Sequence, residues 1–165
     1  MIRGLAGAWG ERMSIDQRLA ELGITLPQPA APVAAYVPTV EHGGLIHISG
    51  QISFAEDGSL IKGRLGEDLD LDAGIAAARR CGIMLVAQLK AALGSLDRVE
   101  KIVKLGVFVN STPAFVDQPK VANGASELMQ DVFGEAGRHA RSAVGVTVLP
   151  LGVAVEVDAI VAVRP

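Results

Sequence analysis

The hydrophobic residues of this chain recur with period two in some segments and every three or four residues in others. Period two is typical of a half-buried strand and occurs in 33–40, 45–53 and 99–110, with a turn signal at 41–44 between the first two. Helical spacing predicts a short helix over 15–22, a long helix from Asp72 to Gly94 and a further helix over 114–133.

The segment 139–163 holds two β-branched runs joined by Leu149-Pro150-Leu151-Gly152, which we expect to form a closing hairpin. The order strands, helix, strand, helix, hairpin predicts an α+β domain with a single mixed β-sheet and two helices on one face. Valines on both faces of the last two strands favour association between sheets, because a lone antiparallel sheet usually leaves one face to solvent. We therefore expect a homo-oligomer.

Composition narrows the class of protein. A chain of 165 residues, 50% hydrophobic and 20% charged, fits one folded domain, and no apolar run approaches the roughly 18 residues that cross a bilayer. A net charge of −3 and 4% aromatic residues argue against nucleic acid as a partner. The single cysteine, Cys81, suits a reducing cytoplasm, and scattered histidines without zinc spacing predict no metal site.

Few residues offer chemistry. Arg141 opens one run of the predicted hairpin, and Glu156 and Asp158 lie two apart in the other. A guanidinium fork binds a carboxylate bidentately, and a carboxyl in an apolar strand has a raised pKa and can handle a proton. Spacing alone leaves open a structural ion pair between Arg141 and either acid. In the expected hairpin register, Glu156 and Arg141 lie on the order of 16 Å apart along the sheet, flanking a ligand.

The closing segment carries a family resemblance. Its pattern, R-S-A-V-G-V-x-x-L-P-x-x-x-x-V-E-V-D-A-I, closely resembles the RidA/YjgF family, which is also labelled endoribonuclease L-PSP or translation-inhibitor-like. The similarity extends upstream through Tyr36, the turn at 41–44, the sequence I-S-G-Q-I and the strand K-I-V-K-L-G-V-F-V. It covers 32–163 as a RidA/YjgF-like domain, with 1–31 as an N-terminal extension that carries the short helix.

The resemblance implies a chorismate-mutase-like fold, a homotrimer whose sheets form a central barrel, and ligand clefts between subunits. It implies hydrolysis of reactive small enamine or imine acids of the 2-aminoacrylate type to 2-keto acids and ammonia, with no cofactor or metal. Arg141 would bind the substrate carboxylate, and Glu156 would polarise the attacking water with the backbone carbonyl of Ala143. Gly50 would offer backbone contacts, and Tyr36 would line the cleft from a neighbouring subunit.

Two positions depart from the family pattern. Ala143 stands where characterised deaminases of the family usually carry cysteine, and either Asn123 or Ser126 would supply the polar group from the second helix. The alternatives are a noncatalytic trimer that binds a small carboxylate, or an endoribonuclease or translation inhibitor, as the family label suggests. Chorismate mutase is an alternative at the level of fold alone.

Overall fold

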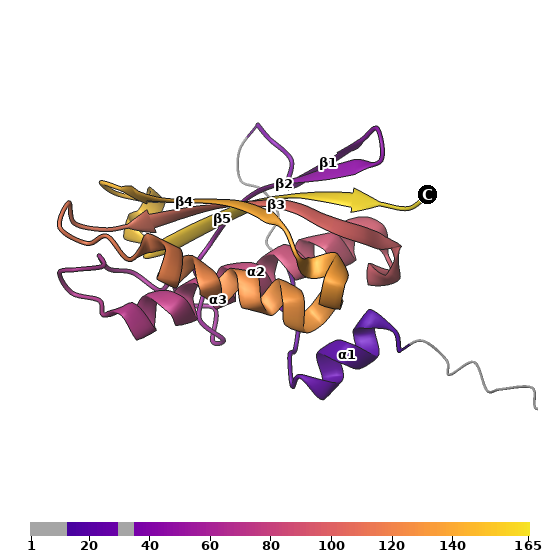
Figure 1. Ribbon diagram of the computed structural model, residues 1–165, viewed down its shortest axis with the longest axis horizontal. Helices are drawn as coiled ribbons and strands as arrows, with labels where there is room; N and C mark the ends of the chain where they lie inside the picture. Colours follow the sequence, from indigo (N-terminus) through magenta and orange to yellow (C-terminus); the bar gives the residue numbers. More distant parts are fainter. Residues whose placement is uncertain (1–12, 30–34) are drawn as a thin grey trace, which may run out of the picture.

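The computed structural model describes residues 13–29 and 35–165. Its centre is a five-stranded mixed sheet with the strand order β1-β2-β5-β3-β4 (Figure 1). The strands are β1 (Thr39–His42), β2 (Leu45–Ile52), β3 (Val99–Asn110), β4 (Ala140–Val146) and β5 (Val155–Val163). Adjacent strands are antiparallel except for β3 and β4, which are parallel.

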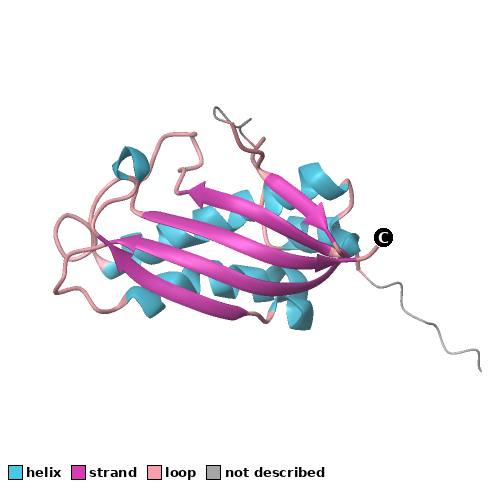
Figure 2. Cartoon of the chain, turned by 90° about the horizontal axis from the view of Figure 1, so that it is seen from above, coloured by secondary structure: helices cyan, strands magenta, loops and turns pink. Residues whose placement is uncertain are grey.

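Two long helices, α2 (Leu71–Leu93) and α3 (Gln118–Phe133), cover one face of the sheet, as the sequence predicts. The short helix α1 (Ile15–Glu21) packs below them and buries Leu19 in the common core. Figure 2 shows the opposite face, across which the strands run without a covering helix. No helix in the described ranges is long and apolar enough to span a membrane.

The ends of α2 follow from single residues. The Asp70 side chain accepts a hydrogen bond from the Ala73 amide at the N-terminus, and Gly94, with a φ of 73°, ends the helix.

Helix α3 begins later than the predicted residue 114, because Pro119 belongs to its first turn, where a missing N–H costs nothing. The strand predicted over 33–40 begins only at Thr39, and its first two residues lie outside the described ranges.

The predicted closing hairpin is wrong. Strands β4 and β5 do not pair with each other, because β3 lies between them, parallel to β4 and antiparallel to β5. The chain leaves β3, forms α3 and returns as β4, which is the crossover that a parallel pair requires. The Pro150–Gly152 turn (η3) then redirects the chain to the far side of β3.

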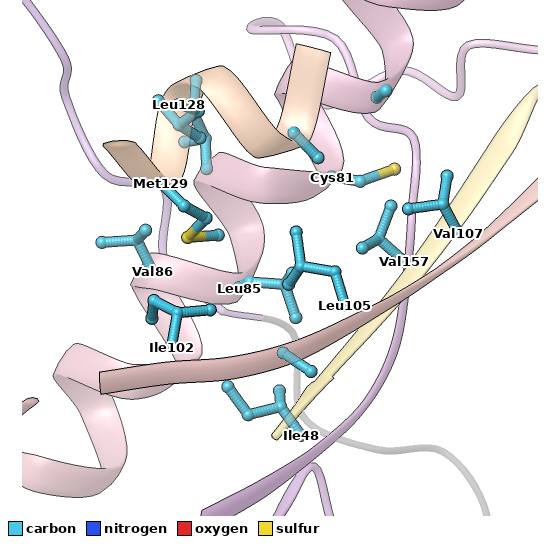
Figure 3. Packing of buried hydrophobic residues seen from close by; sticks show 14 of the residues in the cluster. Ile48, Cys81, Leu85, Val86, Ile102, Leu105, Val107, Leu128, Met129 and Val157 are labelled. Carbon is cyan, nitrogen blue, oxygen red and sulfur yellow. The ribbon is translucent and has the colours of Figure 1, made fainter. Parts of the chain in front are cut away.

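The register of the strands separates two faces. Alternate residues such as Leu105, Val107 and Val157 are buried against α2 and α3, where they form the core with Leu85 and Cys81 (Figure 3). The intervening residues point to the uncovered face, and one row across the sheet on that side is Ile52, Glu156, Phe108 and Val144. The face on which a candidate residue lies therefore follows from its strand position.

Candidate functional site

Arg141 lies on β4, the edge strand of the sheet, and its side chain points to the face covered by α3. It is aligned with the buried Leu105 of β3. Its Nη1 donates to Asn123 Oδ1 (2.8 Å) and Ser126 Oγ (3.1 Å), and its Nη2 donates to the Pro119 carbonyl (3.2 Å). All three acceptors belong to α3, so one helix holds the guanidinium. No carboxylate of the described residues pairs with it, so the structural ion pair left open by spacing is not found within the chain.

A guanidinium has five N–H donors. Three are used by α3, which leaves the Nε–H and one Nη2–H without a partner among the described residues. These two groups form one edge of the fork, the geometry that matches the two oxygens of a carboxylate. The same three bonds that orient Arg141 thus leave a bidentate edge for a ligand.

A shallow pocket of about 300 Å³ adjoins this guanidinium, between β4 and α3. It is lined by Asn123, Ser126, Gln130, Arg138, His139 and Arg141. The sequence left open whether Asn123 or Ser126 supplies the polar group from the second helix. Both do, because these positions are one helical turn apart and both contact Arg141.

Ser126 also contacts His139. The two side chains lie 2.8 Å apart, from Ser126 Oγ to His139 Nε2, and His139 Nδ1 lies 2.6 Å from the Gly137 carbonyl oxygen. A carbonyl only accepts, so Nδ1 carries the proton, and in the neutral ring Nε2 accepts from the Ser126 hydroxyl. Burial lowers the pKa of His139, and the charges of Arg141 and Lys101 lower it further, against the opposing effect of the Gly137 carbonyl. Neutral imidazole is therefore the form at neutral pH.

Glu156 lies on the uncovered face, away from α3. Its carboxylate lies over Gly50 of β2, where a Cβ would overlap Oε1. The register of β2 against β5 shifts between Ile48 and Gln51, so Ser49 and Gly50 together oppose the single residue Asp158, which is a β-bulge. Burial, with a smaller contribution from the Asp158 charge, raises the pKa of Glu156. The carboxyl thus holds a proton to higher pH than an ordinary glutamate.

Arg141 and Glu156 do not meet within one chain. Arg141 is aligned with Leu105 of β3 and Glu156 with Phe108, three positions along the same strand. That offset corresponds to about 10 Å along the sheet, with two strand spacings of about 5 Å each across it. An odd offset also places the side chains on opposite faces. The hairpin register, which put both groups beside one ligand in one chain, is therefore corrected.

The remaining candidates are spread over the sheet. Ala143 lies two residues after Arg141 on the helix-covered side of β4 and packs at the margin of the core. Tyr36 precedes β1, at the edge of the sheet opposite β4, and 55% of its surface is exposed. Within one chain the structure groups Arg141, Asn123 and Ser126, and separately Glu156 and Gly50; it does not bring Tyr36 to either group.

His139 is the site residue that the sequence analysis missed, since scattered histidines gave no spacing for a metal. A signal was present, because His139 stands two residues before Arg141 at the start of a strand. Residues two apart in a strand share a face. The side chains of His139 and Arg141 are therefore expected on the same face of the sheet.

The sheet with its two covering helices and an arginine held at one edge defines a small α+β fold with a polar pocket beside that arginine. The family model described as "YjgF/chorismate_mutase-like, putative endoribonuclease" matches residues 16–161. The chain belongs to this YjgF/chorismate-mutase-like family, and the fold predicted from the resemblance is confirmed.

The chain is also similar to individual proteins and solved structures. The chain is 55% identical over 148 residues to Protein TCP17 of Trypanosoma cruzi, covering 89% of this chain and 92% of the relative. Protein Atu1372 of Agrobacterium tumefaciens, whose structure is described as having unknown function, is 44% identical with a TM-score of 0.84, covering 92% of this chain and 94% of that one. RidA from an Antarctic Psychrobacter is 28% identical with a TM-score of 0.56, covering 82% and 94%.

Proposed function

We propose that the Arg141 pocket binds the carboxylate of a reactive small enamine or imine acid, which the protein hydrolyses to a 2-keto acid and ammonia. The observation that carries this proposal is the guanidinium held by three bonds to α3 with a bidentate edge left for a ligand. An imine carbon is already electrophilic, so hydrolysis needs an anchored substrate, a positioned water and a route for protons. Membership of the family that includes RidA supports the choice of this reaction.

Glu156 is the group that positions and polarises the attacking water. Its place over Gly50, beside the apolar side chains of Ile52 and Phe108, suits a carboxyl that holds a water by hydrogen bonds, and its raised pKa means that it titrates at higher pH than an ordinary glutamate. Because Glu156 and Arg141 lie on opposite faces of one sheet, a site that uses both must combine two subunits. Arg141 at the edge of one sheet would approach Glu156 on the uncovered face of the next.

The uncovered face supports the homotrimer that such a site needs. Val40 and Val144 are 52% and 45% exposed there, and Phe108 and Ile160 are half-buried. Apolar strand residues on an open sheet face favour burial against another copy. Three sheets facing inward would form a barrel with α2 and α3 outside, and exposed Tyr36 would then be available to close a neighbour's cleft.

Ala143 fits this proposal through its backbone. The family's usual cysteine is credited with a role mainly through its main-chain carbonyl, which alanine also provides. Because Ala143 has no thiol, the proposed reaction uses no thiol chemistry at this position.

The first test is release of ammonia and 2-keto acid from a panel of freshly generated imino acids, with a structured RNA as a separate arm for the endoribonuclease label. Acceleration over the spontaneous reaction is expected for small imino acids. RNA cleavage without imine hydrolysis would replace this proposal. Saturable keto-acid binding without turnover would leave a noncatalytic carboxylate-binding protein.

The second test concerns the shared site. Arg141→Ala and Glu156→Ala subunits, each inactive alone, are mixed after subunit exchange has been demonstrated. If clefts combine Arg141 and Glu156 from different chains, some clefts in the mixture carry both residues and activity partly returns. No recovery, or a monomer by sedimentation at micromolar concentration, would refute the shared site.

A further inference from the structure

The Arg141 pocket contains a hydroxyl and an imidazole that can handle a proton, whereas Glu156 of the same chain lies on the opposite face of the sheet. Ser126 is only 8% exposed, yet it is one of the residues that line the pocket, and its hydroxyl stands between Arg141 and His139. It accepts from Arg141 Nη1 and donates to His139 Nε2, which leaves one lone pair on Oγ for a ligand or a water in the pocket.

We propose that Ser126 is a catalytic residue that takes a proton from the attacking water while passing its own proton to His139. This inference rests on the proposed imine hydrolysis and adds the residues that carry its proton. A hydroxyl bonded to a neutral imidazole whose other nitrogen is held by a carbonyl is the arrangement by which enzymes make serine exchange its proton. Here the Gly137 carbonyl fixes the ring.

The step balances for a protonated imine. The water oxygen bonds to the imine carbon as the C=N π-electrons move to nitrogen, the water's proton goes to Ser126 Oγ, and the serine proton goes to His139 Nε2. His139 then returns its proton through Ser126 to the amine nitrogen. The C–N bond breaks as the carbonyl forms, the hydroxyl proton is given up through the same pair, and that proton leaves with ammonia as ammonium.

The charges around His139 suit a ring that starts neutral. Arg141 on β4 and Lys101 on β3 are its cationic neighbours, and both oppose protonation. The adjacent Arg138 is paired with Glu135 of the Gly134–Gly137 turn, and α3 contributes the uncharged Ser126 and Gln130. Protonation of His139 is therefore transient in the empty pocket. A bound carboxylate makes this protonation easier, because it offsets the positive charge of Arg141 and Lys101.

A purely structural role, in which serine and histidine only hold Arg141, predicts different kinetics. His139→Gln keeps an acceptor for the Ser126 hydroxyl but takes up no proton. We expect its kcat to fall roughly 100-fold with KM within about threefold, and the loss of activity that follows His139 protonation at acid pH to disappear. Asn123→Ala removes a different acceptor from Arg141, so it should raise KM and leave the pH profile unchanged. His42→Gln, on exposed β1, is the control and should match the parent.

The experiment measures kcat, KM and their pH dependence for the parent, the three variants and Ser126→Ala on the best imino acid. It also measures the pKa of His139 by NMR with and without pyruvate, which should raise it. An unchanged kcat and pH profile in His139→Gln, or an His139 pKa indifferent to pyruvate, overturns this inference and leaves the proposed function standing. No ammonia release by the parent overturns both.

Discussion

Replacing Arg141 with lysine keeps the charge in the pocket and removes the fork. The Nε–H and the remaining Nη2–H would each make a charge-assisted hydrogen bond to a ligand carboxylate, worth about 1.5–3 kcal/mol. Lysine is a point donor that replaces only one of them. Since 1.4 kcal/mol corresponds to a factor of ten, the dissociation constant of a small 2-keto acid should rise about 10- to 100-fold.

The assay is calorimetric titration with pyruvate, a stable analogue of the proposed product. Arg79→Lys is the matched control, because Arg79 pairs with Asp131 outside the pocket and should change the affinity less than about twofold. Far-UV circular dichroism during thermal unfolding reports whether each variant folds.

A folded Arg141→Lys protein that binds pyruvate as tightly as the parent would refute the anchor. An equal loss in Arg79→Lys would show that the effect is general electrostatics. A variant that fails to fold would instead show that the three bonds to α3 are mainly structural.

Three further outcomes are expected. Glu156→Gln should lower kcat far more than affinity for pyruvate, since the neutral amide polarises the attacking water less than the carboxylate does. In the parent, loss of the carboxylate form at low pH should begin at higher pH than for an ordinary glutamate, because its pKa is raised. Equal losses in kcat and affinity would assign it to binding. Gly124→Ala should lower the free energy of unfolding by about 1–2 kcal/mol in urea, because its Cβ would overlap the Ile75 backbone carbonyl where α3 crosses α2. Backbone cannot rotate away as a side chain can, so the overpacking cost is about 2–3 kcal/mol, against about 1 kcal/mol of gained helix propensity. Unchanged stability would mean that the helices separate freely. Cys81 should resist thiol reagents in the native protein, because burial raises its pKa; labelling without unfolding would contradict its place in the core.

Local signals were sufficient for most elements but not for their pairing. The helix predicted from Asp72 to Gly94 corresponds to α2, Leu71–Leu93, and the alternation of 99–110 corresponds to β3. The hairpin prediction failed because proximity in sequence and a Pro-Leu-Gly turn were taken to mean pairing. The order strand, helix, strand over 99–146 was the better guide, because a helical crossover of that length joins parallel strands.

The candidate site divides in the same way. Arg141 and Glu156 were identified because burying a charge in an apolar strand costs free energy, so a charged residue kept there indicates a pairing or a functional role. That the two lie on opposite faces follows from pairing through β3, which no local pattern states. Asn123 and Ser126 could not be separated by sequence because a helix presents both to the same neighbour. His139 was discounted because it was considered only as a metal ligand.

The place of β5 has a consequence for how the protein is made. It follows the other four strands in sequence, yet it lies between β2 and β3 and pairs with both. A nascent chain that has not yet released Val155–Val163 from the ribosome therefore carries two unpaired strand edges and no central sheet. Such late, long-range pairing slows folding, and it leaves unpaired strand edges that are prone to aggregation during synthesis. Release of β5 from the ribosome is the event that permits the domain to fold, and a stop codon before Val155 would yield a chain that aggregates rather than a shortened protein.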